Sequence, residues 1–165
     1  MWYVVWTSTG LENKARELIE GFGETGFVPR KAINMKIKGC WVFRERALFP
    51  GYLFVDTDEI EELSLKLFRS EGFSHVLVTN KKYFPLYGND AILIDKLYNG
   101  GGLFETSEGY IEGDEIVVTS GPLCGLEGLI RRVDRHKRLA YIDIDMFGQV
   151  LSTSVGLEIV DKRSS

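Results

Sequence analysis

The sequence predicts an α+β protein in which an N-terminal βαββαβ sandwich precedes a small C-terminal β-barrel. In the first hundred residues, segments with helical spacing alternate with β-branched and aromatic runs. A run of three glycines at positions 100–102 then ends the periodic pattern. Beyond about residue 112 only short β runs remain, separated by Gly, Pro and charged turns, as is typical of a small barrel.

Composition and length limit the class of protein. The chain has 165 residues, of which 44% are hydrophobic and 27% charged, as expected for a soluble protein of one or two domains. No apolar run approaches the roughly 18 residues that a membrane helix needs. The N-terminal MWYVVW is too short for a signal-peptide core. We therefore expect a cytoplasmic monomer that does not enter a membrane.

The first half predicts its elements in order. Residues 2–7 read as a strand, and the Thr9–Glu12 spacing fits a capping box, with the Thr9 oxygen capping the Glu12 amide. A basic region follows, with a hairpin tip at Lys38-Gly39, and a second helix begins near Asp58. Residues 74–79 read as a strand and 89–98 as a third helix. The expected apolar stripes are Leu11, Ala15, Leu18, Ile19 and Phe22 in the first helix, and Leu63, Leu67 and Phe68 in the second.

The stretch LFPGYLFV at residues 48–55 stands out from the rest of the first half. Its aromatic and aliphatic residues predict a largely buried strand, and Pro50-Gly51 predicts an edge, a bulge or a bend within it. In a regular strand Phe49 and Tyr52 would point to opposite faces, so one of them is expected in the core. Aromatic rings clustered beside a kink are typical of a surface that contacts a partner.

The glycine run predicts a flexible linker, because consecutive glycines bury nothing and are costly to order. We therefore predict three segments: a domain at 1–98, a Gly-rich linker at 99–111 and a second domain at 112–165. The strands expected in the second domain are residues 115–119, 128–133, 139–144, 149–153 and 157–160.

Charge is distributed unevenly along the chain. The net charge is −4, yet one short segment of the acidic second domain is strongly basic. It contains Arg131, Arg132, Arg135, His136, Lys137 and Arg138. Such a patch predicts contact with a phosphate backbone, because arginine suits phosphate and base stacking. The alternative is a solvated hairpin turn.

Catalytic and metal-binding patterns were not found. The glycines of GPLCGLEG have neither dinucleotide-fingerprint nor P-loop spacing. Cys124 has no evident His–acid pair, and two cysteines with two histidines make a zinc site improbable. We expect reduced thiols, no catalytic residue, no metal and no cofactor, and therefore no enzyme.

Several motifs in order resemble the NusG family of transcription elongation factors. WYVV, Gly10 with Glu12, Val28-Pro29 and LFPGYLFV are similar to its N-terminal (NGN) domain. GDEIVVTSGPLCGLEGLI and the later Met146-Phe147-Gly148 are similar to its SH3-like KOW domain. The resemblance covers nearly the whole chain.

The resemblance implies that the N-terminal domain docks on the clamp helices of RNA polymerase and suppresses pausing, while the KOW domain recruits another factor or RNA. The polymerase-facing residues that it implies are Trp6, Phe49, Tyr52, Phe54 and Tyr3. The basic run would then bind nascent RNA, in particular a hairpin. The resemblance also implies two further partners, which are DNA beside the N-terminal domain and a ribosomal protein.

Details of LFPGYLFVD and GFSHV resemble the specialised LoaP- and RfaH-related antiterminators more than the general factor. RfaH-like reading of DNA is not expected, because only Lys14 keeps the charge found at the corresponding positions. Two alternatives remain open. One is a general NusG-type factor whose KOW domain contacts a ribosomal protein or termination factor. The other is a ribosomal-type KOW RNA-binding protein.

Overall fold

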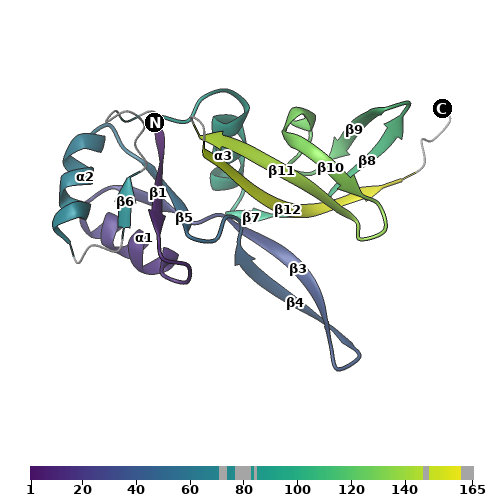
Figure 1. Cartoon of the computed structure of the whole chain (residues 1–165), viewed down its shortest axis with the longest axis horizontal. Coiled ribbons are helices and arrows are strands. Elements are labelled where there is room, and N and C mark those ends of the chain that lie inside the picture. The colour runs from purple at the N-terminus through teal and green to yellow at the C-terminus, as the bar shows by residue number, and fades with distance from the viewer. Residues whose placement is uncertain (71–73, 77–82, 84, 147–148, 161–165) are drawn as a thin grey trace.

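The computed structural model describes residues 1–70, 74–76, 83, 85–146 and 149–160, and it has the predicted α+β architecture (Figure 1). In chain order the elements are β1 (Trp2–Thr7), α1 (Glu12–Gly21), β2 (Thr25–Phe27), β3 (Arg30–Ile37), β4 (Cys40–Ala47), β5 (Tyr52–Asp56), α2 (Ile60–Arg69), β6 (Ser74–Val76), α3 (Gly88–Asn99), β7 (Leu103–Phe104), β8 (Ser107–Glu112), β9 (Glu115–Ser120), the 3-10 helix η1 (Glu127–Leu129), β10 (Ile130–Asp134), β11 (Leu139–Met146) and β12 (Gln149–Ile159).

The N-terminal sheet has the strand order β2-β5-β1-β6, with antiparallel pairing throughout. Val4 lies opposite Phe54, and Val5 lies opposite Leu53. Because side chains alternate along a strand, the Val5–Leu53 pair faces one side of the sheet and the Val4–Phe54 pair faces the other. Helices α1 and α2 cover the first side. The resulting helix-side core contains Tyr3, Val5, Ala15, Ile19, Leu53, Val55, Ile60, Leu63, Leu67 and Val76.

The buried stripe of α2 is narrower than the sequence predicts. Ile60, Leu63 and Leu67 are buried at helical spacing, whereas Phe68 is 72% exposed. Phe68 belongs to the apolar stripe in the sequence but does not pack in the core. One residue beyond Leu67 is a rotation of about 100° around the helix, which turns Phe68 away from the buried face of α2.

Strands β3 and β4 form a long hairpin that projects away from both sheets (Figure 1). Their register runs from Arg30 opposite Ala47 to Ile37 opposite Cys40. Lys38 and Gly39 close it with φ angles of 50° and 83°, so the predicted hairpin tip is confirmed. The hairpin is not part of the N-terminal sheet, as a single βαββαβ sheet would require. It forms a separate three-stranded sheet with β7.

The glycine run leads directly into paired strands. The backbone N–H of Arg30 donates to the Gly102 carbonyl at 2.8 Å, and β7 then pairs in parallel with β3. Strand β8 begins at Ser107, inside the segment expected to be a linker, and joins the C-terminal sheet. The segment from Gly102 to Glu112 therefore contains two strands, β7 and β8, that pair with strands of both halves of the chain.

The C-terminal module is a five-stranded sheet with the order β10-β11-β12-β8-β9. The five expected β segments correspond to four strands, namely β9, β10, β11 and, for the last two segments, the two ends of β12. The two segments expected at 149–153 and 157–160 form the single strand β12, because residues 154–156 continue the pairing with β11. This long strand pairs with β11 through its first part and with β8 through its last residues.

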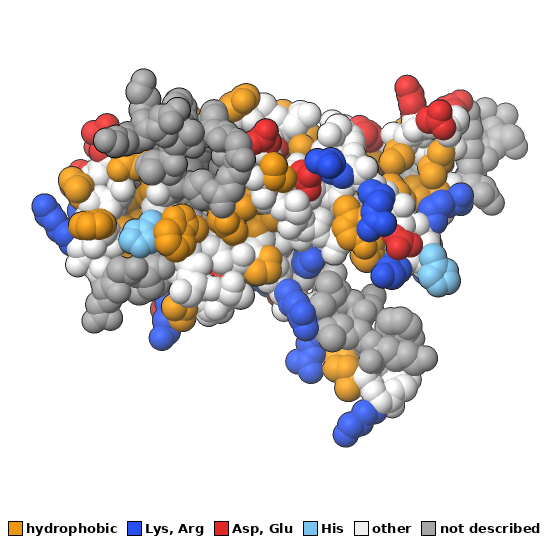
Figure 2. Space-filling model, in the orientation of Figure 1, with side chains coloured by type: hydrophobic (Ala, Val, Ile, Leu, Met, Phe, Trp, Pro, Cys, Tyr) orange, Lys and Arg blue, Asp and Glu red, His pale blue; other side chains and the backbone are white. Residues whose placement is uncertain are grey.

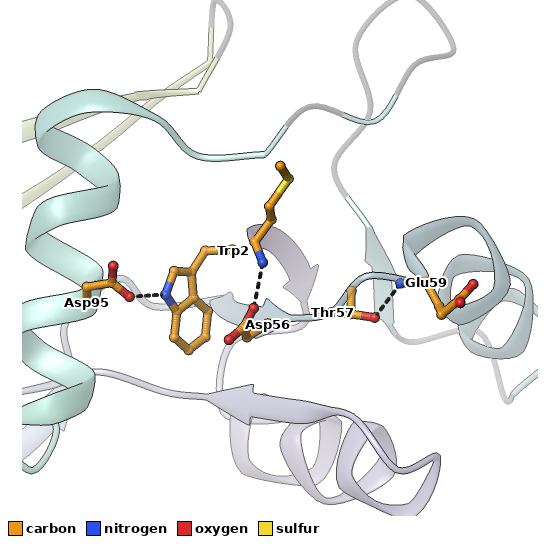
Figure 3. Close-up of polar contacts among 6 residues, drawn as sticks. Trp2, Asp56, Thr57, Glu59 and Asp95 are labelled. Carbon is orange, nitrogen blue, oxygen red and sulfur yellow. Dashed lines mark hydrogen bonds and ion pairs between the residues drawn. The ribbon is translucent and has the colours of Figure 1, made fainter.

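The two halves share one hydrophobic core. The side of the N-terminal sheet away from α1 and α2 packs on α3 and on the C-terminal module (Figure 1). The Trp2 Nε1–H donates to Asp95 Oδ1 at 2.6 Å, which ties β1 to α3 (Figure 3). Lys96 Nζ of α3 donates to the Cys124 carbonyl at 2.9 Å. The buried members are Trp2, Val4, Phe27, Leu48, Phe49, Phe54, Leu86, Leu93, Ile94 and Leu97 from the first half, and Phe104, Val118, Leu123, Leu126, Leu129, Ala140, Ile142, Ile144, Leu151, Val155 and Leu157 from the second.

Candidate functional site

The LFPGYLFV stretch is a turn followed by a strand. The Tyr52 N–H donates to the Phe49 carbonyl at 3.0 Å, and Gly51 has a φ of 85°. The pairing of β5 begins only at Tyr52, so the prediction of a strand from residue 48 was wrong for its first four residues. Because a turn separates Phe49 from Tyr52, strand alternation does not place them on opposite faces.

Glu12 holds this turn against α1. Its carboxylate accepts the Gly51 N–H at 2.7 Å and the Gly10 N–H at 3.0 Å. The predicted capping by Thr9 is not formed, since Leu11 is the N-cap residue and no side chain caps the helix. Burial opposes ionisation of the carboxyl, but the backbone N–H groups of Gly51, Glu12 and Gly10 offset it, so the pKa of Glu12 is lowered.

A Cβ atom at position 51 would lie 3.2 Å from the Thr7 carbonyl oxygen. That close approach and the positive φ together explain the glycine. The Thr7 N–H also donates to the Gly51 carbonyl at 2.8 Å, so the turn is attached to β1 as well as to α1.

Three of the predicted polymerase-facing residues share one side of the N-terminal sheet. Trp6 lies opposite Tyr52 in the β1–β5 register, and Phe54 follows two residues after Tyr52 on the same face. Phe49 reaches this side from the turn, with its ring centroid 6.1 Å from that of Phe54. We call these four residues the aromatic face.

The aromatic face is only partly accessible. Trp6 is 45% exposed and packs beside the His75 ring at 4.7 Å. Tyr52 is half-buried. Phe49 and Phe54 are 2% and 0% exposed, within the core shared with the C-terminal module.

Tyr3 is the fifth predicted polymerase-facing residue, and it lies on the other side of the sheet. It is 9% exposed and belongs to the helix-side core, opposite Val55. The structure therefore does not bring Tyr3 together with the aromatic face. The alternation of side chains along WYVVWT predicts this placement, because residues an odd number of positions apart, such as Tyr3 and Trp6, face opposite sides of a strand.

The basic run occupies β10 and the turn that leads to β11. Arg131 and Arg132 lie in β10, whereas the turn holds Arg135, His136, Lys137 and Arg138, and all six side chains are exposed. Asp134 Oδ1 accepts the Lys137 N–H at 2.9 Å, and Arg138 has a φ of 56°. The backbone N–H of Lys137, more than the nearby cations, lowers the pKa of Asp134.

An irregularity in β10 explains how two consecutive arginines reach the outer face of the sheet. The register with β11 shifts between Ile130 and Arg132, which is the mark of a β-bulge. The Arg132 guanidinium lies 4.3 Å from the centre of the Tyr141 ring. Arg131 Nη1 pairs with Asp143 Oδ2 at 2.7 Å, and Asp143 also accepts the Ser152 hydroxyl at 2.6 Å.

Sequence reasoning missed Tyr141 and Asp143, the neighbours of the two arginines. The signal was present in the alternation of LAYIDID, since Ala140, Ile142 and Ile144 are buried and the residues between them face outward. Tyr141 then supplies an aromatic surface beneath a cation, an arrangement suited to stacking bases.

Other chemistry-bearing groups are scattered. Cys40 and Cys124 are exposed free thiols. Across the described ranges, no three His, Cys, Asp or Glu side chains are arranged to hold a metal ion. None of the helices in the described part of the chain is long and apolar enough to cross a bilayer.

The fold and these surfaces define a two-module α+β protein with an aromatic sheet face on one module and a basic hairpin on the other. The family model for transcription termination factor NusG matches residues 1–94. The chain therefore belongs to the NusG family, which confirms the family predicted from its motifs.

Relatives and a solved structure agree with this assignment along most of the chain. The transcription termination/antitermination protein NusG of Haemophilus influenzae is 28% identical over 171 aligned residues, covering 95% of this chain and 90% of that protein. The Pasteurella multocida protein of the same name is 27% identical, covering 99% and 95%. A structure concerned with domain interaction in Thermotoga maritima NusG matches the fold with a TM-score of 0.55, 19% identity and coverage of 94% and 92%.

Proposed function

We propose that this protein is a transcription elongation and antitermination factor that docks on RNA polymerase through the aromatic face and binds nascent RNA through the basic run. In this proposal it is a specialised member of the NusG family, close to the LoaP- and RfaH-related branch. The exposed Arg132 guanidinium on the Tyr141 ring, beside the further cations of the β10–β11 turn, carries the RNA part of the proposal.

The polymerase part rests on aromatic residues that share one side of a sheet. Exposed aromatic rings with apolar neighbours are frequent hot spots of protein interfaces. Trp6 and Tyr52 are accessible while the two modules are packed. Phe49 and Phe54 become available to a partner only if the C-terminal module moves off this side of the sheet, because both lie in the shared core.

The RNA part rests on the chemistry of the basic run. Guanidinium groups form paired hydrogen bonds with phosphate oxygens and stack on bases. Arg131 is already paired with Asp143, but its side chain is 70% exposed, so it remains open to a second partner on its outer side. A single-stranded or looped RNA suits this surface, because its bases are free to stack on an aromatic ring.

A second candidate is a general NusG-type factor whose KOW domain contacts a ribosomal protein or a termination factor. The relatives named above favour it, since both carry the name transcription termination/antitermination protein NusG. The third candidate is a ribosomal-type KOW RNA-binding protein, but that function would leave the aromatic face without a role.

Hairpin-RNA binding by the whole chain tests the proposal. With single-stranded contacts contributing about −0.7 each to the slope of log K against log salt, an Arg131→Ala/Arg132→Ala/Arg135→Ala variant should reduce the slope by about 2 units. A matched Lys14→Ala/Arg16→Ala/Arg69→Ala variant, which removes three cations from helix surfaces and the helix end, should leave the slope unchanged. A flat salt slope for the unaltered protein would eliminate RNA binding and favour the general factor.

Co-purification with core polymerase tests the other half. We expect the Arg131/Arg132/Arg135 variant to co-purify with core polymerase as the unaltered protein does. A Trp6→Ala variant should fail to co-purify. Failure of the unaltered protein to co-purify would instead support the ribosomal-type reading.

A further inference from the structure

A row of side chains crosses the boundary between the two modules on one face of the molecule. Arg46 lies opposite Lys31 in the β3–β4 register. Lys31 Nζ donates to the Ser154 carbonyl at 2.9 Å and to the Thr153 hydroxyl at 3.2 Å. Ser154 lies opposite Tyr141.

The row continues to β10, where Tyr141 lies opposite Arg132. Five strands from both modules, β4, β3, β12, β11 and β10, thus contribute one member each. Two strand spacings separate Ser154 from Arg132, which is about 10 Å.

The members of the row on the C-terminal sheet face outward. Ala140, Ile142 and Val155 are buried, so their strand neighbours Tyr141 and Ser154 point to the opposite, outer side. Figure 2 shows Lys and Arg side chains on a single face, both over the β3–β4 hairpin and over the strands of the C-terminal sheet. We call Arg46, Lys31, Ser154, Tyr141 and Arg132 the cross-module row.

Two acidic side chains near the row, Glu45 and Asp143, are engaged by other groups. Glu45 is the one acidic residue in the sequence of the hairpin, and it pairs with Arg30. Strand alternation puts Arg30 and Glu45 on the opposite face of the hairpin from Lys31 and Arg46. On the C-terminal sheet, Asp143 is engaged by Arg131 and Ser152.

Lys31 is held in a setting that disfavours its positive charge. Its described hydrogen-bond partners, Thr153 and Ser154, are neutral. Burial and then the neighbouring Arg46 lower the pKa of Lys31. A bound phosphate would oppose this lowering, because a nearby negative charge favours the charged form of Lys31 and offsets the repulsion from Arg46.

We propose that one strand of RNA lies along the cross-module row, with its phosphates on Arg46, Lys31 and Arg132 and a base against Tyr141. This inference rests on the proposed RNA-binding function and extends the RNA site from the C-terminal module onto the β3–β4 hairpin. The complete site exists only while the two modules are packed, because Lys31 meets β12 only in that arrangement.

Packing and RNA binding are then linked. RNA that contacts both modules stabilises the packed arrangement, and packing strengthens RNA binding by the same factor. The packed arrangement buries Phe49 and Phe54. One molecule therefore cannot bind RNA along the whole cross-module row and dock on polymerase through Phe49 and Phe54 at the same time. Polymerase docking through those two rings should weaken RNA binding.

Salt-dependent binding of a hairpin RNA with a single-stranded flank, measured on the whole chain, tests the row. Arg46→Gln should reduce the slope of log K against log salt by about 0.7. Lys38→Gln is the matched control, since it removes one charge from the tip of the same hairpin, and it should leave the slope unchanged. Equal slopes for the Arg46 and Lys38 variants would overturn the row.

The two proposals fail in different ways. If the Arg131/Arg132/Arg135 variant loses binding while Arg46→Gln does not, the RNA function stands and the cross-module row is wrong. If neither variant changes RNA binding, both are wrong. If Arg46→Gln weakens binding of single-stranded DNA as much as of RNA, the assignment of the row to RNA is overturned.

Amide hydrogen exchange is a second, independent test of RNA binding along the cross-module row. RNA should slow amide exchange at residues 30–32 and 153–155 together, because the strand would bridge them. Protection confined to residues 131–141 would restrict the site to the C-terminal module and overturn the row.

Discussion

The two sides of the N-terminal sheet are covered in different ways. One side packs on α1 and α2, which are close to it in sequence, through aliphatic residues such as Val5, Leu53 and Val55. The other side packs on α3 and the C-terminal module and carries Trp2, Trp6, Tyr52 and Phe54. Most aromatic rings of the sheet thus lie on the side that α3 and the C-terminal module cover, whereas Tyr3 lies on the helix side. Under the proposed function, polymerase would replace the C-terminal module on this side, and large rings can form good contacts with either partner.

Substitutions of buried residues on the two sides should have the largest effect. Leu53→Ala should lower the free energy of unfolding by about 2–5 kcal/mol and Phe49→Ala by about 3–5 kcal/mol, since each leaves a cavity. Urea denaturation measures both. Leu65→Ala, at a position of α2 that is 55% exposed, is the control and should change stability by less than about 0.5 kcal/mol.

NMR spectra of the same variants sharpen the contrast. Leu53→Ala should perturb signals of α1 and α2, whereas Phe49→Ala should perturb α3 and the C-terminal module. Identical perturbation patterns for the two variants would contradict the division of the sheet into separately covered sides.

Glu12 connects the two sides, because it starts α1 yet holds the turn that precedes Tyr52. Glu12→Gln should cost about 1–3 kcal/mol, since a charged acceptor for two backbone N–H groups is lost. A lowered folded pKa means that ionised Glu12 contributes stability above its ordinary pKa of 4.5, and that this contribution is lost as pH falls through the folded value. Denaturation midpoints between pH 3 and 6 should therefore vary less in the Gln variant than in the unaltered protein.

The packing of the C-terminal module on this side of the sheet should respond to pH. Burial, and then Asp145 of β11, raise the pKa of Asp90 in α3 to about 6. In separated modules the pKa of Asp90 should return toward 3.8. Packing is therefore strongest at pH values below 3.8 and weakens as the pH rises from 3.8 through about 6. Interdomain NMR shifts should show more packing at pH 5 than at pH 7. Asp90→Asn should remove most of this dependence, and an unchanged pH profile would show that another group is responsible.

Trp6→Ala should have the smallest effect on stability, within about 1 kcal/mol, because the ring is already 45% exposed. Its effect on polymerase binding should be larger, at about 2–4 kcal/mol, as for a hot spot. Tyr3→Phe is a matched aromatic control on the helix side and should leave polymerase binding unchanged. Equal loss of binding in both variants would contradict the assignment of docking to the aromatic face.

Local patterns predicted much of the fold. The helical stripe of α1, the hairpin tip at Lys38-Gly39 and most C-terminal strands follow from spacing and turn residues alone. Interactions over long sequence separations caused the errors. Glu12 did not form a capping box, because the Gly51 N–H, 39 residues away, is its buried partner. Strand β8 was missed because its pairing with β12 and β9 orders a segment that follows three glycines.

The sequence alone determined the class of fold, the NusG family and the presence of an aromatic turn and a basic run, because each depends on residues close together in the chain. The tertiary structure decided which aromatic rings are accessible. Phe49 and Tyr3 are both buried, on different sides and under different covers. It also decided that Lys31 reaches Ser154, 123 residues away. Such contacts depend on how two separately patterned modules pack, and no local pattern encodes that arrangement.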